Sequence, residues 1–114
     1  MIPKLRFKDD NGNDFPAWNT TVRLEEISAF ITKGATPTRY RFEWQIKGIY
    51  FFRNDCIKNN IFVDGDYSYI SEEANEFLKR SEIRGDDIVI AITGDIGKVG
   101  LVPRKIKKAN INQH

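Results

Sequence analysis

The segment from residue 85 to residue 100 constrains the fold most, because an apolar run leads there directly into a glycine-rich corner. Residues 88–92 are unbroken in apolar character, which suits a strand buried on both faces and is too short for a typical helix. The corner, Gly94 to Lys98, precedes a second apolar stretch at residues 99–102. This order predicts a β-hairpin. Two interpretations of the corner are open: its glycines supply only the positive φ angles of a turn, or the corner presents N–H groups and an ammonium group to an anion. The residues of the corner, considered alone, favour the plain turn.

Length and composition limit the chain to one small domain of ordinary globular character. The 114 residues can bury one modest core, and 40% apolar with 30% charged residues is typical of such domains. No apolar run approaches the length of a membrane span, and the first residues lack a signal-peptide core. Cys56 is the only cysteine, which excludes a disulfide framework and a thiolate metal site. We therefore expect an intracellular, cytoplasmic protein with no structural metal and no cofactor.

Charge is segregated along the chain although the net charge is only +2. Residues 98–114 hold five cations and no acid, and residues 33–47 hold four cations against one acid. Residues 64–87, by contrast, hold eight acids and three bases. Each basic segment, considered alone, is as often an ordinary solvated surface as a site that binds a polyanion. Both of them adjoin glycine turns, however, which favours a groove that follows the phosphates of a polyanion.

The first third of the chain predicts an irregular arm followed by a short helix. The arm covers residues 1–19 and contains a tight turn at Asn11-Gly12. Asn19 or Thr20 is expected to cap the helix, in which apolar residues recur at helical spacing. A strand is expected at residues 29–32, before Gly34 ends it.

The rest of the chain predicts more strands than helices. Strands are expected at residues 49–52, 61–63 and 67–70, and a further element at residues 109–112. Ser71 is expected to cap a helix that directs Ala74, Phe77 and Leu78 inward and ends with Lys79 and Arg80. No regular alternation of strand and helix is visible. We therefore predict an α+β fold, a single small domain with a mostly antiparallel twisted sheet and two short helices.

Motifs of common enzymes are incomplete in this sequence. The glycine corner lacks the first glycine of a nucleotide-binding P-loop and the hydroxyl residue that would bind Mg²⁺. The only histidine is His114, the last residue, which disfavours a Ser-His or Cys-His nucleophile pair. A metal-dependent nuclease remains as an alternative, built from the carboxylates of Asp64, Asp66, Asp86 and Asp87. Because Gly85-Asp86 reads more simply as a turn, catalysis is not expected.

Eight segments follow one another in an order and spacing that are specific when taken together. They are residues 3–7 (PKLRF), 15–18 (FPAW), 24–27 (LEEI), 32–38 (TKGATPT), 70–74 (ISEEA), 85–90 (GDDIVI), 93–99 (TGDIGKV) and 109–113 (ANINQ). With these segments the chain resembles the DNA specificity subunit of type I restriction-modification systems, in particular its N-terminal target recognition domain. The resemblance covers nearly the whole chain.

The resemblance implies a DNA-binding function without catalysis. Such a domain reads one half of a bipartite site in double-stranded DNA and directs methyltransferase and restriction subunits of the same system to it. A complete subunit has two recognition domains and long spacer helices, which this sequence lacks. Residues 1–114 then correspond to a partial recognition domain, with exposed apolar surface that we expect to promote self-association. A second alternative is a protein-interaction fragment that docks a methyltransferase subunit and binds DNA negligibly alone.

Two sets of candidate DNA-binding residues follow from this interpretation. Base edges in the major groove are read by amide, hydroxyl and guanidinium groups on rigid loops. The base candidates are Thr36, Thr38, Arg39, Tyr40, Arg41, Asn110 and Gln113. The phosphate candidates are Lys33, Lys98, Arg104, Lys105, Lys107 and Lys108. We predict that residues 36–41 carry specificity and that the glycine corner forms one phosphate clamp with the basic tail; the amides near the end of the chain could equally cap local backbone groups.

Overall fold

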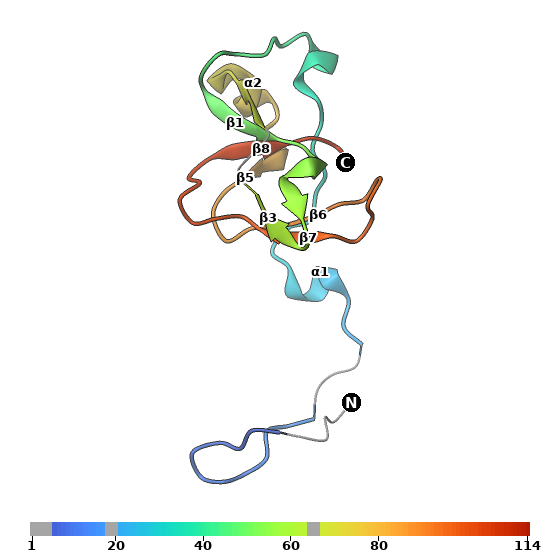
Figure 1. The fold of residues 1–114 in the computed structure, drawn as a ribbon, viewed down its shortest axis with the longest axis vertical. Coiled ribbons are helices and arrows are strands. Elements are labelled where there is room, and N and C mark those ends of the chain that lie inside the picture. The colour runs from blue at the N-terminus through green and yellow to red at the C-terminus, as the bar shows by residue number, and fades with distance from the viewer. Residues whose placement is uncertain (1–5, 18–20, 64–66) are drawn as a thin grey trace. The chain divides into compact units, whose positions relative to one another are not determined.

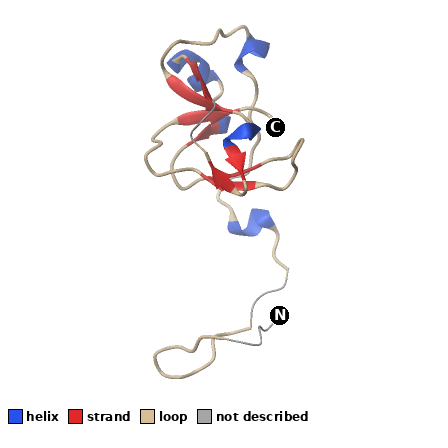
Figure 2. Ribbon diagram, viewed as in Figure 1, coloured by secondary structure: helices blue, strands red, loops and turns tan. Residues whose placement is uncertain are grey.

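The computed structural model describes residues 6–17, 21–63 and 67–114, and the chain divides into two units, Met1–Ile31 and Thr32–His114 (Figure 1). In the second unit short strands and helices are joined by extended loops (Figure 2). Across the described residues the α and β content is mixed, the strands are mostly antiparallel, and two short α-helices are present. The fold class predicted from the sequence is therefore confirmed.

The first unit contains a tight loop and the short helix α1, Leu24–Ile27. An antiparallel bridge joins Lys8 to Asp14 around Gly12, whose φ is +78°, so the predicted Asn-Gly turn is present. The predicted caps Asn19 and Thr20 lie outside the described residues. The helix begins at Leu24 instead, where the side chain of Glu26 accepts a hydrogen bond from the N–H of Arg23 at 2.9 Å. The strand expected at residues 29–32 is not formed.

A four-stranded sheet in the order β4-β1-β8-β5 forms the centre of the second unit. Its strands are β1 (Ile49–Phe52), β4 (Tyr67–Ile70), β5 (Glu82–Ile83) and β8 (Ala109–Ile111). β1 is antiparallel to β4 and parallel to β8, and β8 is antiparallel to β5. Because side chains alternate along β1, Phe51 and Phe52 enter different apolar clusters on the two faces of the sheet, and both are fully buried.

Helix α2, Glu72–Phe77, begins where the sequence predicts it. The hydroxyl of Ser71 accepts a hydrogen bond from the N–H of Ala74 at 3.0 Å, which satisfies one free N–H group of the first turn. Ala74 and Leu78 are buried as expected, but Phe77 is 60% exposed, so its inward placement was wrong. The helix is too short to carry Lys79 and Arg80, which lie in the 3₁₀-helix η3, Lys79–Ser81.

The predicted hairpin is formed by β6, Ile88–Ile90, and β7, Val99–Leu101. Val89 and Gly100 face the core, where Gly100 approaches β2 (Ile57–Lys58) and β3 (Ile61–Phe62). Ile88, in contrast, is 66% exposed. The expectation of a strand buried on both faces was therefore wrong, because this two-stranded sheet has apolar partners on one face alone within the described residues. Gly94 and Gly97 have φ of +69° and +89°, which confirms their role in the turn.

Within the described ranges, no helix has the length and apolar character that crossing a membrane requires.

Candidate nucleic-acid interface

The segment that precedes the predicted reading loop lies directly against β8. Gly34 is buried so close to this strand that a Cβ atom there would overlap the carbonyl oxygens of Ile111 and Asn112. Two residues further on, the hydroxyl of Thr36 donates to the side-chain oxygen of Gln113 at 2.8 Å. Two predicted base-reading residues are thus brought together from distant parts of the sequence. Their partly buried side chains anchor the loop.

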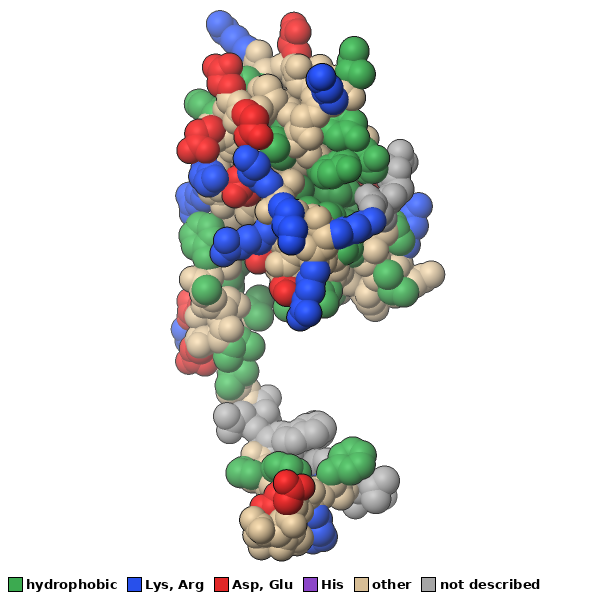
Figure 3. All heavy atoms as spheres, turned by 90° about the vertical axis from the view of Figure 1, so that its left-hand side faces the viewer, with side chains coloured by type: hydrophobic (Ala, Val, Ile, Leu, Met, Phe, Trp, Pro, Cys, Tyr) green, Lys and Arg blue, Asp and Glu red, His purple; other side chains and the backbone are tan. Residues whose placement is uncertain are grey.

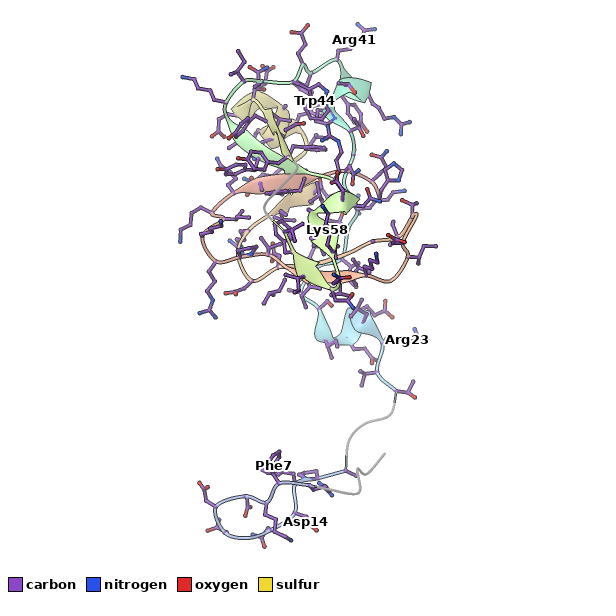
Figure 4. The ribbon with its side chains drawn as sticks, viewed as in Figure 1. Phe7, Asp14, Arg23, Arg41, Trp44 and Lys58 are labelled. Carbon is purple, nitrogen blue, oxygen red and sulfur yellow. The ribbon has the colours of Figure 1, made fainter. Side chains whose placement is uncertain are left out.

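Residues beyond this anchor form an exposed turn. Pro37 is buried and starts the 3₁₀-helix η1, Pro37–Tyr40, while Thr38 and Arg39 are exposed. Arg41 ends the turn with φ of +67°, a left-handed conformation that few non-glycine residues adopt and that often occurs at functional sites. Its side chain points outward at one end of the second unit (Figure 4). The side chains that are candidates for reading DNA bases are therefore exposed to solvent on a turn whose preceding segment is anchored.

The next part of the chain is held by aromatic contacts. The guanidinium carbon of Arg53 lies 5.0 Å from the centre of the Trp44 ring, which contacts the buried Phe51 edge-on at 5.2 Å. A cation over an aromatic face is stabilising, and here it connects the loop that follows Arg41 to the end of β1. The reading loop is thus restrained on both sides.

A groove of about 610 Å³ lies beside this loop. It is lined by Lys33 from the segment before the loop, by Tyr40 from the loop, and by Phe77 and Arg80 from the end of α2 and from η3. The rings of Tyr40 and Phe77 are 5.1 Å apart. Sequence reasoning did not place Phe77 and Arg80 at this groove, because the helical pattern assigned one to the core and the other to a helix end. The sequence does not show that exposed rings and cations from distant segments line the same groove; only the folded structure does.

Lys98 lies where the turn of the β6–β7 hairpin closes, and its carbonyl oxygen accepts a hydrogen bond from the N–H of Ala91 at 2.9 Å. Its ammonium group lies 2.8 Å from a carboxylate oxygen of Asp95, and this hydrogen bond lowers the pKa of Asp95. The pair is solvated, since the Asp95 side chain is 78% exposed. Exposed ion pairs contribute little free energy, so a phosphate could replace the carboxylate.

Residues of the predicted basic tail lie in the loop between β7 and β8. Arg104 donates to both carboxylate oxygens of Asp86 at 3.0 Å, and Lys108 contacts Glu72 at 2.8 Å. Lys105 and Lys107 are exposed, and Lys107 makes no ion pair with any residue that the structure describes. Figure 3 shows Lys and Arg side chains gathered on the side of the second unit that carries this loop.

The corner and the tail are separated in space. Lys98 precedes β7 and Arg104 follows it, and Figure 1 shows the hairpin tip and the loop between β7 and β8 on opposite sides of the second unit. The predicted single phosphate clamp is therefore not formed. The structure instead has two separate basic sites.

Asn110 is a structural residue rather than a reader of bases. It is fully buried, and its amide donates to Asn75 at 3.0 Å and to the carbonyl oxygen of Leu78 at 3.1 Å. Its side-chain oxygen accepts from Ser81 at 2.7 Å. The prediction that Asn110 contacts DNA was wrong, because its hydrogen-bonding groups are used inside the fold.

The carboxylates of the alternative nuclease site have local partners or lie outside the described residues. Asp86 contacts Arg104, and Asp87 accepts a hydrogen bond from the N–H of Arg84 at 2.9 Å. The turn predicted at Gly85-Asp86 is present, with φ of +73° at Asp86. Asp64 and Asp66 fall in the undescribed segment. Among the residues that are described, no three histidine, cysteine, aspartate or glutamate side chains are grouped as metal ligands.

A scan against protein-family models finds no match to this chain, and a search of curated proteins finds none either. Function is therefore inferred from the order of the sequence motifs and from the geometry of the loop and its groove.

Proposed function

We propose that this chain is a sequence-specific DNA-binding module of a type I restriction-modification specificity subunit. In that role it reads one half of a bipartite site and directs methyltransferase and restriction subunits to the DNA, without catalysing a step itself. The observation that carries the proposal is the anchored loop, in which Thr38, Arg39 and Arg41 are exposed beyond the buried Gly34 and Pro37.

The loop has the chemistry that base reading requires. A guanidinium group can donate two hydrogen bonds to the O6 and N7 atoms of guanine in the major groove. Discrimination is strongest when the reading group is held in place before binding, because less conformational entropy is then lost. The Thr36–Gln113 hydrogen bond and the contacts of Trp44 supply such restraint on either side of the turn.

The basic loop between β7 and β8 suits contact with phosphates. Its exposed cations attract DNA of any sequence and position it without reading bases. Lys107 is the clearest candidate, because no described carboxylate competes for it. Reading and positioning are thus assigned to different elements.

Substitutions in the reading loop test the proposal. We expect Arg39→Ala or Arg41→Ala to cost about 1–3 kcal/mol of binding free energy and to relax base preference at one position of the selected site. The measurement is selection from a randomised duplex library, followed by fluorescence anisotropy on the selected duplex and its single-base variants. Lys107→Ala is the control, expected to weaken binding to all sequences alike. An unchanged preference in both arginine variants would exclude this loop as the reader.

A second function, docking to a methyltransferase subunit without DNA reading, is favoured by one specific feature. The outward face of the β6–β7 hairpin carries Ile88 and Leu101, which are 66% and 58% exposed. Contiguous exposed apolar surface often marks a protein interface. A salt titration distinguishes the two functions, since a docking fragment would show no salt-sensitive binding to DNA.

A further inference from the structure

The groove beside the reading loop combines positive charge with exposed aromatic surface. Lys33 and Arg80 supply the charge, and Tyr40 and Phe77 supply the rings. No acidic side chain occurs among the described residues that line it. The cations come from segments far apart in the sequence, so the fold alone brings them to one groove.

The two cations of the groove are free to bind an external anion. Lys33 and Arg80 are both exposed, and neither makes an ion pair within the described part of the chain. Three acids of α2 and β5 contact other cations within the described residues. Lys79 contacts Glu82 at 3.0 Å and Glu76 at 3.7 Å, as Lys108 contacts Glu72. A polyanion in the groove would therefore meet the positive charge of Lys33 and Arg80, with no acidic side chain among the described lining residues.

The two rings form an apolar wall at the same place. Tyr40 is 48% and Phe77 60% exposed, and their planes are inclined at 52°. Phe42 contacts Phe77 at a ring distance of 5.4 Å and supports it. Aromatic rings beside cations are typical of surfaces that bind nucleic acid, where the ring meets a base or sugar and the cation meets a phosphate.

We propose that this groove binds the sugar–phosphate backbone of one DNA strand beside the bases that the loop reads. Lys33 and Arg80 contact phosphates, and Tyr40 and Phe77 pack against deoxyribose. The inference rests on the proposed function for its ligand and extends it to Phe77 and Arg80, which lie outside the loop and outside the basic tail. The groove thereby positions the reading loop on the duplex.

The experiment measures binding of a labelled random-sequence duplex by anisotropy over a range of salt concentrations. We expect Arg80→Ala to flatten the plot of log affinity against log salt by about one unit, and the Lys33→Ala/Arg80→Ala double variant by about two. Arg84→Ala is the matched control, because Arg84 is also exposed but does not line the groove. The slope of this control should equal that of the unmodified chain. Circular dichroism spectra verify that each variant is folded.

Three results would overturn the inference. The first is a salt slope for Arg80→Ala equal to that of the unmodified chain. The second is an equal reduction of the salt slope in Arg80→Ala and Arg84→Ala. The third is the absence of binding to the random-sequence duplex at low salt. Tighter binding of a single-stranded oligonucleotide than of the duplex would also overturn it, because the groove would then take an unpaired strand.

The same series separates failure of the groove from failure of the proposed function. If the randomised library yields no preferred sequence but the difference between Arg80→Ala and Arg84→Ala persists, the groove stands and sequence reading fails. If a sequence is selected but Arg80→Ala has no effect, the groove fails and sequence reading stands.

Discussion

Gly34 shows how one residue positions the reading loop. Its missing side chain lets the backbone approach the carbonyl oxygens of Ile111 and Asn112, and Thr36 then reaches Gln113. A larger residue must move the loop away from β8, because backbone atoms of the strand occupy the space. The position of the exposed arginines therefore depends on a residue that cannot itself contact DNA.

We expect Gly34→Ala to lower the free energy of unfolding by about 1–3 kcal/mol, because the added methyl group overpacks a closed interface. Urea denaturation measures the change. Gly100→Ala is the matched control: it is also buried, but its Cβ would meet a side-chain atom of Ile57 at 3.3 Å, which the neighbour can accommodate by a small shift. An equal loss of unfolding free energy in Gly34→Ala and Gly100→Ala would contradict this role of Gly34.

At the scale of elements, a polar network joins β8, α2 and η3. Asn110 donates to Asn75, and Asn75 donates in turn to Glu82 at 2.6 Å. Lys79 also donates to Glu82 at 3.0 Å. Burial alone would raise the pKa of Glu82, but the hydrogen bonds from Asn75 and Lys79 outweigh it and lower this pKa below 4.5. The ionised carboxylate is thus part of the packing between these elements.

The network predicts a specific dependence of stability on pH. Because the pKa of Glu82 is lower in the folded than in the unfolded chain, its contribution is present above about 4.5 and is lost as the pH falls through the folded pKa. We expect Glu82→Gln to lose less stability than the unmodified chain between neutral pH and this acidic range. Urea denaturation at several pH values gives the comparison. Glu73→Gln, at an exposed position on α2, should follow the unmodified chain; identical curves for all three proteins would refute the assignment.

At the scale of the whole molecule, the β6–β7 hairpin has one face in the core and one in solvent. Ile88 pairs with Leu101 and Ile90 with Val99 across the hairpin, so four apolar side chains share the outward face. All four side chains are exposed to solvent. A patch of this kind favours association, because burying apolar surface releases about 25 cal/mol for each Å² removed from water.

We expect the chain to self-associate as its concentration rises, and Leu101→Lys to shift it toward the monomer. Sedimentation velocity at several concentrations measures the distribution. Ile46→Lys is the control, since Ile46 is 98% exposed but lies outside the hairpin. A monomer at every concentration, or equal effects of the two lysines, would show that the hairpin face is not the contact.

Features that depend on neighbouring residues could be predicted from the sequence. The Ser71 cap, the turns at Gly12 and Gly94, and the strands β1 and β4 of the central sheet were predicted correctly. The strand β5 was not predicted, and β8 was expected only as an element of unspecified type. Each of the correct predictions depends on interactions within a few positions, such as a hydroxyl that reaches an N–H group three residues ahead. The fold class follows from such elements.

The sequence by itself thus determined several of the strands, the turns, and the supply of cations and hydrogen-bonding side chains. Only the tertiary structure decided which of these are exposed. Asn110 became a core residue because its strand pairs with both β1 and β5, while Phe77 reached the surface beside Tyr40. The physical reason is that the burial of a side chain depends on which distant segments cover each face of its strand or helix. The local residue pattern is the same whether one face is covered or both.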